Sequence, residues 1–154
     1  MPLGVAAAAF GLDALIQTDT EKINALIDTG IKAVQEENID AIAAIITDSY
    51  TDSFHISKAE LMRTCSAELA KSPVETIKTT SHPLIKLSLP TATATVFTKA
   101  TFHKDSHVTQ NLYTSFLKFK VQLHFEKQPD ESWLINRAEI LEINNQPVKW
   151  RQIR

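Results

Sequence analysis

The chain has 154 residues, which is enough for one domain with a hydrophobic core of its own. Apolar residues make up 44% and charged residues 22% of it, as is typical of a soluble globular protein. The formal net charge of −2 and the lack of a basic patch with interleaved aromatic residues argue against a nucleic-acid partner. Lysines such as Lys118 and Lys120 alternate with apolar residues instead, as on the outer face of a strand.

The sequence carries no motif for a cofactor or a metal. Its single cysteine, Cys65, excludes an intrachain disulfide and a Cys-based metal site. The spacing of Cys65 from Leu61 and Leu69 predicts a small buried residue on one helix face. Only three glycines occur, and there is no Gly-rich phosphate loop, nucleophile elbow or zinc motif. We therefore expect neither a cofactor nor a bound metal.

Residues 1–17 form a mostly apolar segment that is too short for a transmembrane helix and lacks the basic region of a secretory signal. One interpretation is the remnant of an export or anchor segment whose upstream part is missing. That interpretation implies an extracytoplasmic or membrane-anchored protein, with the membrane reached only through the missing anchor. The other is an extra helix that packs on the domain or a partner, in a cytoplasmic protein. In both cases we expect the domain to span residues 18–154.

Three helices are predicted at the start of this domain. Thr18 and Glu21 have capping-box spacing, and apolar residues recur at helical intervals after them. Residues 39–46 are apolar nearly all round and predict a short buried helix. Ser57, with Glu60 three residues later, opens the third helix through a second capping box.

After the helices the hydrophobic pattern changes to a period of two. Strands are predicted over residues 84–89, 91–102, 113–125 and 133–143, which are rich in Thr, Val, Ile and Phe. Helices followed by strands indicate an α+β fold. Long strands with one apolar face belong to an antiparallel sheet that packs helices on one side. We predict three N-terminal helices packed on the concave face of a curved antiparallel sheet.

The strand over residues 113–125 has two contrasting faces. Alternation assigns to its apolar face Tyr113, Leu117, Phe119, Val121, Leu123 and Phe125. It assigns to its polar face Lys118, Lys120, Gln122, His124 and Glu126. Leu112 and Phe116 share this otherwise polar face, and exposed apolar side chains favour self-association. We therefore expect a homodimer that forms through the sheet face.

Several stretches resemble the nuclear transport factor 2-like superfamily. The stretch AVQEENIDAIAAIITDSYTD resembles the family's segment in which a helix ends, a short helix follows and an Asp-x-Tyr-type element closes it. The stretch SKAELMRTCSAEL resembles the third helix of the family. The stretch ESWLINRAEI resembles the Trp-x-Ile pattern of its last strand. The closing INNQPVKWRQI resembles the tail of extracytoplasmic domains of this fold. The resemblance covers roughly residues 18–150 and implies a cone-shaped, cystatin-like roll. That fold also houses ketosteroid isomerase, scytalone dehydratase and the SnoaL-like polyketide cyclases, so it does not define a reaction.

The stretch DSYTDSFHISKAEL, residues 48–61, is the main candidate for chemistry. Much of it suits a turn and a helix cap, because short polar side chains can bond nearby backbone N–H groups. The resemblance places it near the mouth of the cavity, where Tyr50 could donate to a ligand and Asp52 or His55 could move a proton. The competing interpretation is that Tyr50 and Phe54 fill the core and His55 is a solvated loop residue.

Two further pairs have suggestive spacing. His103 and His107 flank a predicted hairpin turn, so their spacing of four does not indicate a metal site, and no third ligand is evident. Arg137 and Glu139 lie two apart on a strand and therefore on one face, where they could bind a carboxylate or activate water. The acid sets of ketosteroid isomerase, scytalone dehydratase and limonene epoxide hydrolase are not matched in full.

Two functions remain open. The first is a non-enzymatic domain that binds a small apolar molecule or a protein, with ligand contacts expected from Tyr50, Phe54, His55, Trp133 and Arg137. The second is a cofactor-independent acid–base enzyme acting on a small apolar molecule, with Tyr50, Asp52 and His55 as catalytic candidates. An enzyme should bring two titratable groups to one point of a cavity, whereas a binding domain should have a mostly apolar cavity.

Overall fold

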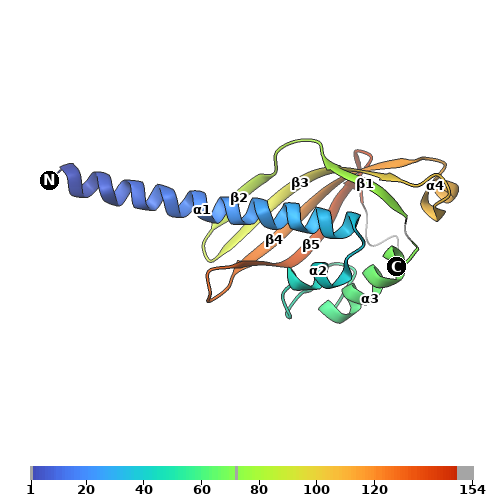
Figure 1. Cartoon of the computed structure of the whole chain (residues 1–154), viewed down its shortest axis with the longest axis horizontal. Coiled ribbons are helices and arrows are strands. Elements are labelled where there is room, and N and C mark those ends of the chain that lie inside the picture. The colour runs from blue at the N-terminus through green and yellow to red at the C-terminus, as the bar shows by residue number, and fades with distance from the viewer. Residues whose placement is uncertain (1, 72, 149–154) are drawn as a thin grey trace.

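The computed structural model describes residues 2–71 and 73–148, with the backbone alone for residues 2–17. It confirms the predicted α+β class: helices lie against a curved, open, antiparallel sheet (Figure 1). The helices are α1 Pro2–Gln35, α2 Ile39–Ala44, α3 Lys58–Leu69 and α4 His107–Leu112. The strands are β1 Val74–Thr79, β2 Leu84–Ser88, β3 Thr91–Phe102, β4 Phe116–Lys127, β5 Trp133–Ile143 and β6 Gln146–Pro147.

The sheet is built around two long antiparallel strand pairs, β3–β4 and β4–β5. Its strand order is β1-β3-β4-β5-β6, and β2 also pairs with β3, on the same side as β1. Residue pairs such as Val96 with Val121 and Leu123 with Ala138 set the register of the three central strands. Irregularities interrupt the β4–β5 ladder at two points. Bulges of this kind bend a strand and increase its twist, which curves the sheet.

One face of the sheet carries the core, and α1 runs along it (Figure 1). We call this the inner face, and the opposite face of the sheet the outer face. Ile23 and Ile27 of α1 are buried in the same cluster as Val96 of β3 and Phe125 of β4. Inward and outward residues alternate along β3, as the period of two predicted.

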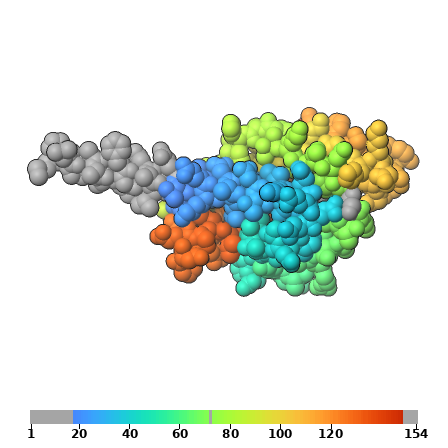
Figure 2. Space-filling view, in the orientation of Figure 1, coloured from blue at the N-terminus to red at the C-terminus, as the bar shows by residue number. Residues whose placement is uncertain are grey.

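The first predicted helix boundary is wrong. Thr18 does not cap a helix, because α1 runs without interruption from Pro2 to Gln35. Alanines at positions 6–9 are strong helix formers, so the backbone continues through the apolar segment. Figure 2 shows residues 18–35 of α1 in shades of blue, lying across the body of the molecule.

The third predicted strand also begins too early. Leu112 ends the short helix α4, which Ser106 caps by accepting a hydrogen bond from the backbone N–H of Thr109 at 3.2 Å. Tyr113 then adopts a left-handed backbone conformation, is 94% exposed, and does not belong to the apolar strand face. Strand β4 starts at Phe116, because the helical turn occupies the residues before it.

The predicted N-cap at Ser57 is confirmed, whereas the returning bond to Glu60 comes from the residue before the cap. The Ser57 hydroxyl accepts from the backbone N–H of Glu60 at 3.2 Å, and Glu60 Oε2 accepts from the Ile56 N–H at 3.2 Å. Between α2 and α3 the chain lies along the free edge of β5. There the backbone N–H of Thr47 donates to the Ile135 carbonyl at 3.0 Å. This edge contact places the candidate stretch beside β5, outside the layer between α1 and the sheet.

Candidate functional site

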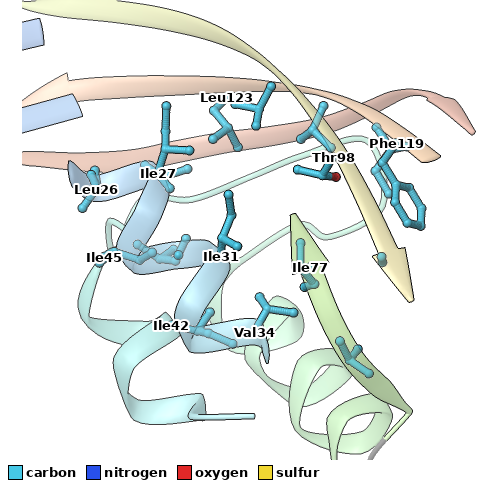
Figure 3. A pocket seen from close by; sticks show the side chains of 18 of the residues that line it. Leu26, Ile27, Ile31, Val34, Ile42, Ile45, Ile77, Thr98, Phe119 and Leu123 are labelled. Atoms are coloured by element: carbon cyan, nitrogen blue, oxygen red, sulfur yellow. The ribbon is translucent and has the colours of Figure 1, made fainter. Parts of the chain in front are cut away.

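A pocket of about 440 Å³ lies between α1, α2 and the inner face of the sheet (Figure 3). Its helix wall consists of Leu26, Ile27, Gly30, Ile31, Val34 and Ile42. Its sheet wall includes Ile77, Val96, Thr98, Ala100, Phe119, Val121, Leu123, Ile135 and Ile140. This volume lies within the range that small-molecule sites usually have.

The chemistry of this pocket is almost purely apolar. Among the described residues that line it, none is titratable, and Thr98 supplies the only polar side chain. In Figure 3 the Thr98 hydroxyl oxygen stands among carbon atoms of aliphatic and aromatic side chains. Such a lining favours apolar molecules, because a charged or strongly polar group would lose its hydration there without compensation.

The candidate residues Tyr50, Asp52 and His55 are brought together, but beside β5. The Tyr50 hydroxyl donates to Asp52 Oδ2 at 2.5 Å, and His55 Nδ1 lies 2.9 Å from the same oxygen. The backbone N–H groups of Phe54 and His55 donate to Asp52 Oδ1 at 2.6 and 2.7 Å. Asp52 therefore serves as the common acceptor that folds this turn around itself.

Burial and hydrogen bonding set opposite protonation states for Tyr50 and Asp52. Burial, together with the neighbouring Asp52 carboxylate, raises the pKa of Tyr50 far above its ordinary value. Burial alone would raise the pKa of Asp52 too, but hydrogen bonds from Tyr50 and His55 hold it below its ordinary value. Tyr50 is thus a fixed donor and Asp52 a fixed acceptor.

Arg137 and Glu139 lie on one face of β5, where they form an ion pair with each other at an N–O distance of 2.8 Å. Glu139 is buried and also accepts from the backbone N–H and the hydroxyl of Ser53, each at 2.9 Å. Its carboxylate therefore ties the candidate turn to β5. This engagement leaves Glu139 poorly placed to activate water.

Trp133 and Asp19 form a buried contact that the sequence pattern did not predict. The indole N–H of Trp133 donates to Asp19 Oδ1 at 3.0 Å, and Lys127 Nζ lies 3.1 Å from the same oxygen. Burial would raise the pKa of Asp19, but the bonds from Trp133 and Lys127 lower it overall. The available signal in the sequence was an acidic residue, Asp19, at helical spacing from the apolar Ile23 and Leu26.

A smaller polar groove of about 370 Å³ lies on the outer face, beside the candidate turn. It is lined by Ser49, Thr51, Thr91, Thr93, His124, Asn136 and Arg137, among others. Burial, reinforced by the Arg137 charge, lowers the pKa of His124, so its ring is neutral near pH 7. Arg137 is the one predicted ligand residue that lines either of these two pockets.

The other predicted ligand residues lie outside both pockets. Tyr50 and Trp133 are buried among protein groups, and the ring of Phe54 stands tilted against that of His55 with centroids 6.1 Å apart. That these residues contact a ligand stays a prediction. His107 begins α4 and pairs with Glu68 at 3.5 Å. Cys65 is partly buried, and burial raises the pKa of its thiol, as does the Asp52 charge.

Residues 2–71 and 73–148 contain no group of three His, Cys, Asp or Glu side chains arranged to hold a metal ion. In the same part of the chain, no helix is both long and apolar enough to cross a membrane.

Solved structures of other proteins show which known fold this chain shares. No protein-family model and no curated protein matches the sequence. A nuclear transport factor 2-like superfamily protein from Salmonella enterica serovar Typhimurium is similar in structure, with a TM-score of 0.67, 13% identity, and coverage of 87% of this chain and 94% of that one. A Nostoc punctiforme protein of unknown function with a cystatin-like fold has a TM-score of 0.62, 14% identity, and coverage of 82% and 91%.

A Streptomyces avermitilis protein described as a candidate dehydratase of the same family has a TM-score of 0.56 and 13% identity. The match covers 86% of this chain and 97% of that one. The chain therefore has the nuclear transport factor 2-like, cystatin-like fold, as its sequence resemblance implied. Identities this low carry the fold and leave the function to the site.

Proposed function

We propose that this chain is a non-enzymatic binding domain that takes a small apolar molecule into the pocket between α1, α2 and the sheet. The observation that carries the proposal is the lining: about 440 Å³ of space bordered by apolar side chains and one hydroxyl. Largely apolar, preformed pockets with few polar groups are the usual sites for small molecules.

The lining also favours binding over catalysis. Acid–base chemistry needs a titratable group within hydrogen-bond reach of the reacting atom. Asp52 already accepts bonds from Tyr50, His55 and two backbone N–H groups, and this cluster stands apart from the described lining of the pocket. An apolar pocket without such a group can hold a molecule and has no means of moving its protons.

Thr98 narrows the class of ligand. Its hydroxyl is the one polar side chain in the described lining, and it can donate one hydrogen bond and accept others. We infer a molecule of mostly hydrocarbon character that carries a single hydroxyl or carbonyl group.

The proposal can be tested by filling the pocket. Ala100 is buried on the inner face, and Ala100→Leu would place three additional carbon atoms in the space that a ligand needs. The apolar fluorophore N-phenylnaphthylamine should bind the unaltered protein and bind Ala100→Leu about tenfold more weakly. The control is Ala59→Leu on the exposed side of α3, which should bind like the unaltered protein. Equal affinity of all three proteins, or no binding by any, would contradict the proposal.

A second variant tests the ligand class. Thr98→Val keeps the shape of the side chain and removes only its hydroxyl. Displacement of the fluorophore by decanol should weaken about fivefold, which corresponds to one net hydrogen bond. Displacement by decane should stay unchanged. Native mass spectrometry of gently purified protein would show whether a molecule of this class is retained.

We also propose a homodimer through the sheet face. Of the two residues on which the sequence based this dimer, Leu112 and Phe116, only Phe116 lies on the sheet. Leu112 lies on α4 instead of on a strand, whereas Phe116 begins β4 on the outer face and is 40% exposed. Phe97 adds a second aromatic ring to that face, covered in part by Lys120 with its ammonium 5.9 Å from the ring centre. An open antiparallel sheet without a helical cover offers the area that such an interface needs.

A further inference from the structure

The end of the molecule that carries α4 combines exposed apolar side chains with unpaired positive charge. In Figure 1 this end lies opposite the N-terminus of α1. Within five residues of sequence, Leu112, Tyr113 and Phe116 are 54%, 94% and 40% exposed. Large apolar groups gathered in this way mark interaction sites more often than singly scattered ones do. We call these three residues the tip.

The conformation of Tyr113 is unusual in itself. Its φ of 55° places it in the left-handed region, where it ends α4 by donating its N–H to the Thr109 carbonyl at 3.0 Å. This position normally belongs to glycine or asparagine, because a side chain at positive φ costs free energy. An aromatic residue here bears that cost while its ring contributes almost no burial. Its presence therefore calls for a role outside the folded chain.

A row of three lysines runs across the outer face next to the tip. Lys78 of β1 is paired with Lys99 of β3, and Lys99 is paired in turn with Lys118 of β4. Paired residues of antiparallel strands lie about 5 Å apart, and like charges directly opposite each other are destabilising. Among the described residues, no carboxylate lies within ion-pair distance of any of the three.

The row and the tip are physically continuous. The ammonium of Lys99 lies 4.4 Å from the centre of the Phe116 ring, so a cation and an exposed apolar ring share one patch. Lys104 in the β3–α4 turn adds one exposed positive charge, and Glu75 and Asp105 are exposed acids of the same region. Glu68 of α3 also reaches this region, because it pairs with His107 of α4 and with Lys71. The balance is positive, since five lysines stand against three carboxylates.

We propose that this end of the molecule docks on an anionic membrane surface, with the tip entering the interfacial layer and the lysine row contacting lipid headgroups. Tyrosine, phenylalanine and leucine suit that layer because it is apolar on one side and hydrated on the other. Lysines near an anionic leaflet gain favourable free energy, and lipid phosphates relieve the repulsion within the row. A nucleic acid would satisfy the lysines and leave Leu112 without a stacking role.

This docking is independent of the apolar pocket. Its residues lie on the outer face and in α4, whereas the described pocket lining belongs to α1, α2 and the inner face. A protein whose pocket remains empty could still bind a membrane in this way, so the two proposals can fail separately.

Co-sedimentation with vesicles tests the inference. The full chain should sediment with vesicles of phosphatidylcholine mixed with phosphatidylglycerol, bind phosphatidylcholine alone much more weakly, and lose binding as salt is raised. Replacing Lys99 and Lys118 by Gln should weaken binding roughly 25-fold, at about fivefold for each lysine. Replacing Leu112 and Tyr113 by Ser should weaken binding at least about tenfold.

Matched controls lie elsewhere on the surface. Ile56→Ser removes an apolar side chain that is 79% exposed, and Lys32→Gln removes an exposed lysine of α1. Both should sediment like the unaltered protein, and circular dichroism should show every variant folded. The inference is overturned if the chain binds neither vesicle or binds both equally, or if the controls weaken as much as the tip and row variants. Binding of a single-stranded oligonucleotide through the lysines, without vesicle binding, would also overturn it.

Discussion

At the scale of single residues, Tyr50 and Asp52 decide whether the candidate turn is structural or chemical. Tyr50→Phe removes the hydroxyl that donates to Asp52 and leaves a buried carboxylate oxygen with one donor fewer. We expect the free energy of unfolding to fall by about 1.5–3 kcal/mol, the usual contribution of a hydrogen bond to a charged group. Urea unfolding measures this loss.

Tyr113→Phe is the matched control, because its hydroxyl lies on an exposed side chain and its removal should leave stability almost unchanged. Fluorophore affinity should be the same in both variants if Tyr50 acts through structure. A Tyr50→Phe protein with full stability and altered ligand affinity or turnover would instead support the enzymatic alternative.

Asp52 also makes stability depend on pH. Its pKa is lowered in the folded protein, so the unfolded chain binds the proton more readily. The stability it contributes is therefore complete above its ordinary pKa of 3.8 and is lost as the pH falls through the lowered value. Asp52→Asn should destabilise the protein at neutral pH and flatten this part of the acid response.

Urea unfolding at a series of pH values from about 2 to 6 would show the change in slope. Asp28→Asn, at an exposed position of α1, serves as the control and should keep the slope of the unaltered protein. An unchanged slope in Asp52→Asn would mean that other carboxylates produce the acid response.

At the scale of elements, the contact of Asp19 with Trp133 and Lys127 anchors α1 to the end of the β4–β5 hairpin. Asp19→Asn removes the charge that holds Lys127, and we expect a loss of about 2 kcal/mol. The loss is moderate because Lys127 keeps 22% of its side chain in solvent, where water screens the pair.

A double-mutant cycle isolates this contact. Asp19→Asn and Lys127→Met should each destabilise the protein, and their combination should cost less than the sum of the two. Strict additivity would mean that the pair contributes no coupling and that apolar packing alone holds α1 in place.

At the scale of the whole molecule, the lysine row limits how two copies can meet. A two-fold interface places the same patch on both subunits, so a contact centred on the row would oppose six ammonium groups. We therefore expect the homodimer to form away from the row and from Phe116, which lies against Lys99, and to use the open area of the outer face around Thr93 and His124.

Analytical ultracentrifugation at micromolar concentration should find a dimer. Thr93→Lys, which places a new charge on the outer face, should convert it to a monomer, whereas Thr29→Lys on α1 should leave it intact. A monomeric unaltered protein would contradict the predicted dimer.

The sequence by itself determined the properties that depend on neighbouring residues. Apolar residues with a period of two predicted β3, β4 and β5, and the spacing of Ser57 and Glu60 predicted the cap of α3. The order of helices before strands predicted the fold class. It also placed Tyr50, Asp52 and His55 close enough in the chain to meet in one turn. These features could be predicted because their hydrogen bonds and packing faces repeat over a few residues.

Only the tertiary structure decided which residues from distant parts of the sequence these helices, strands and turns contact. Asp19 meets Trp133 across 114 positions of sequence, and Ser53 meets Glu139 across 86. The apolar pocket and the lysine row likewise need the register of strands that are distant in sequence. Hydrophobic patterns show which side of a strand is buried, but they do not specify which strand lies beside it, because many pairings bury the same apolar area.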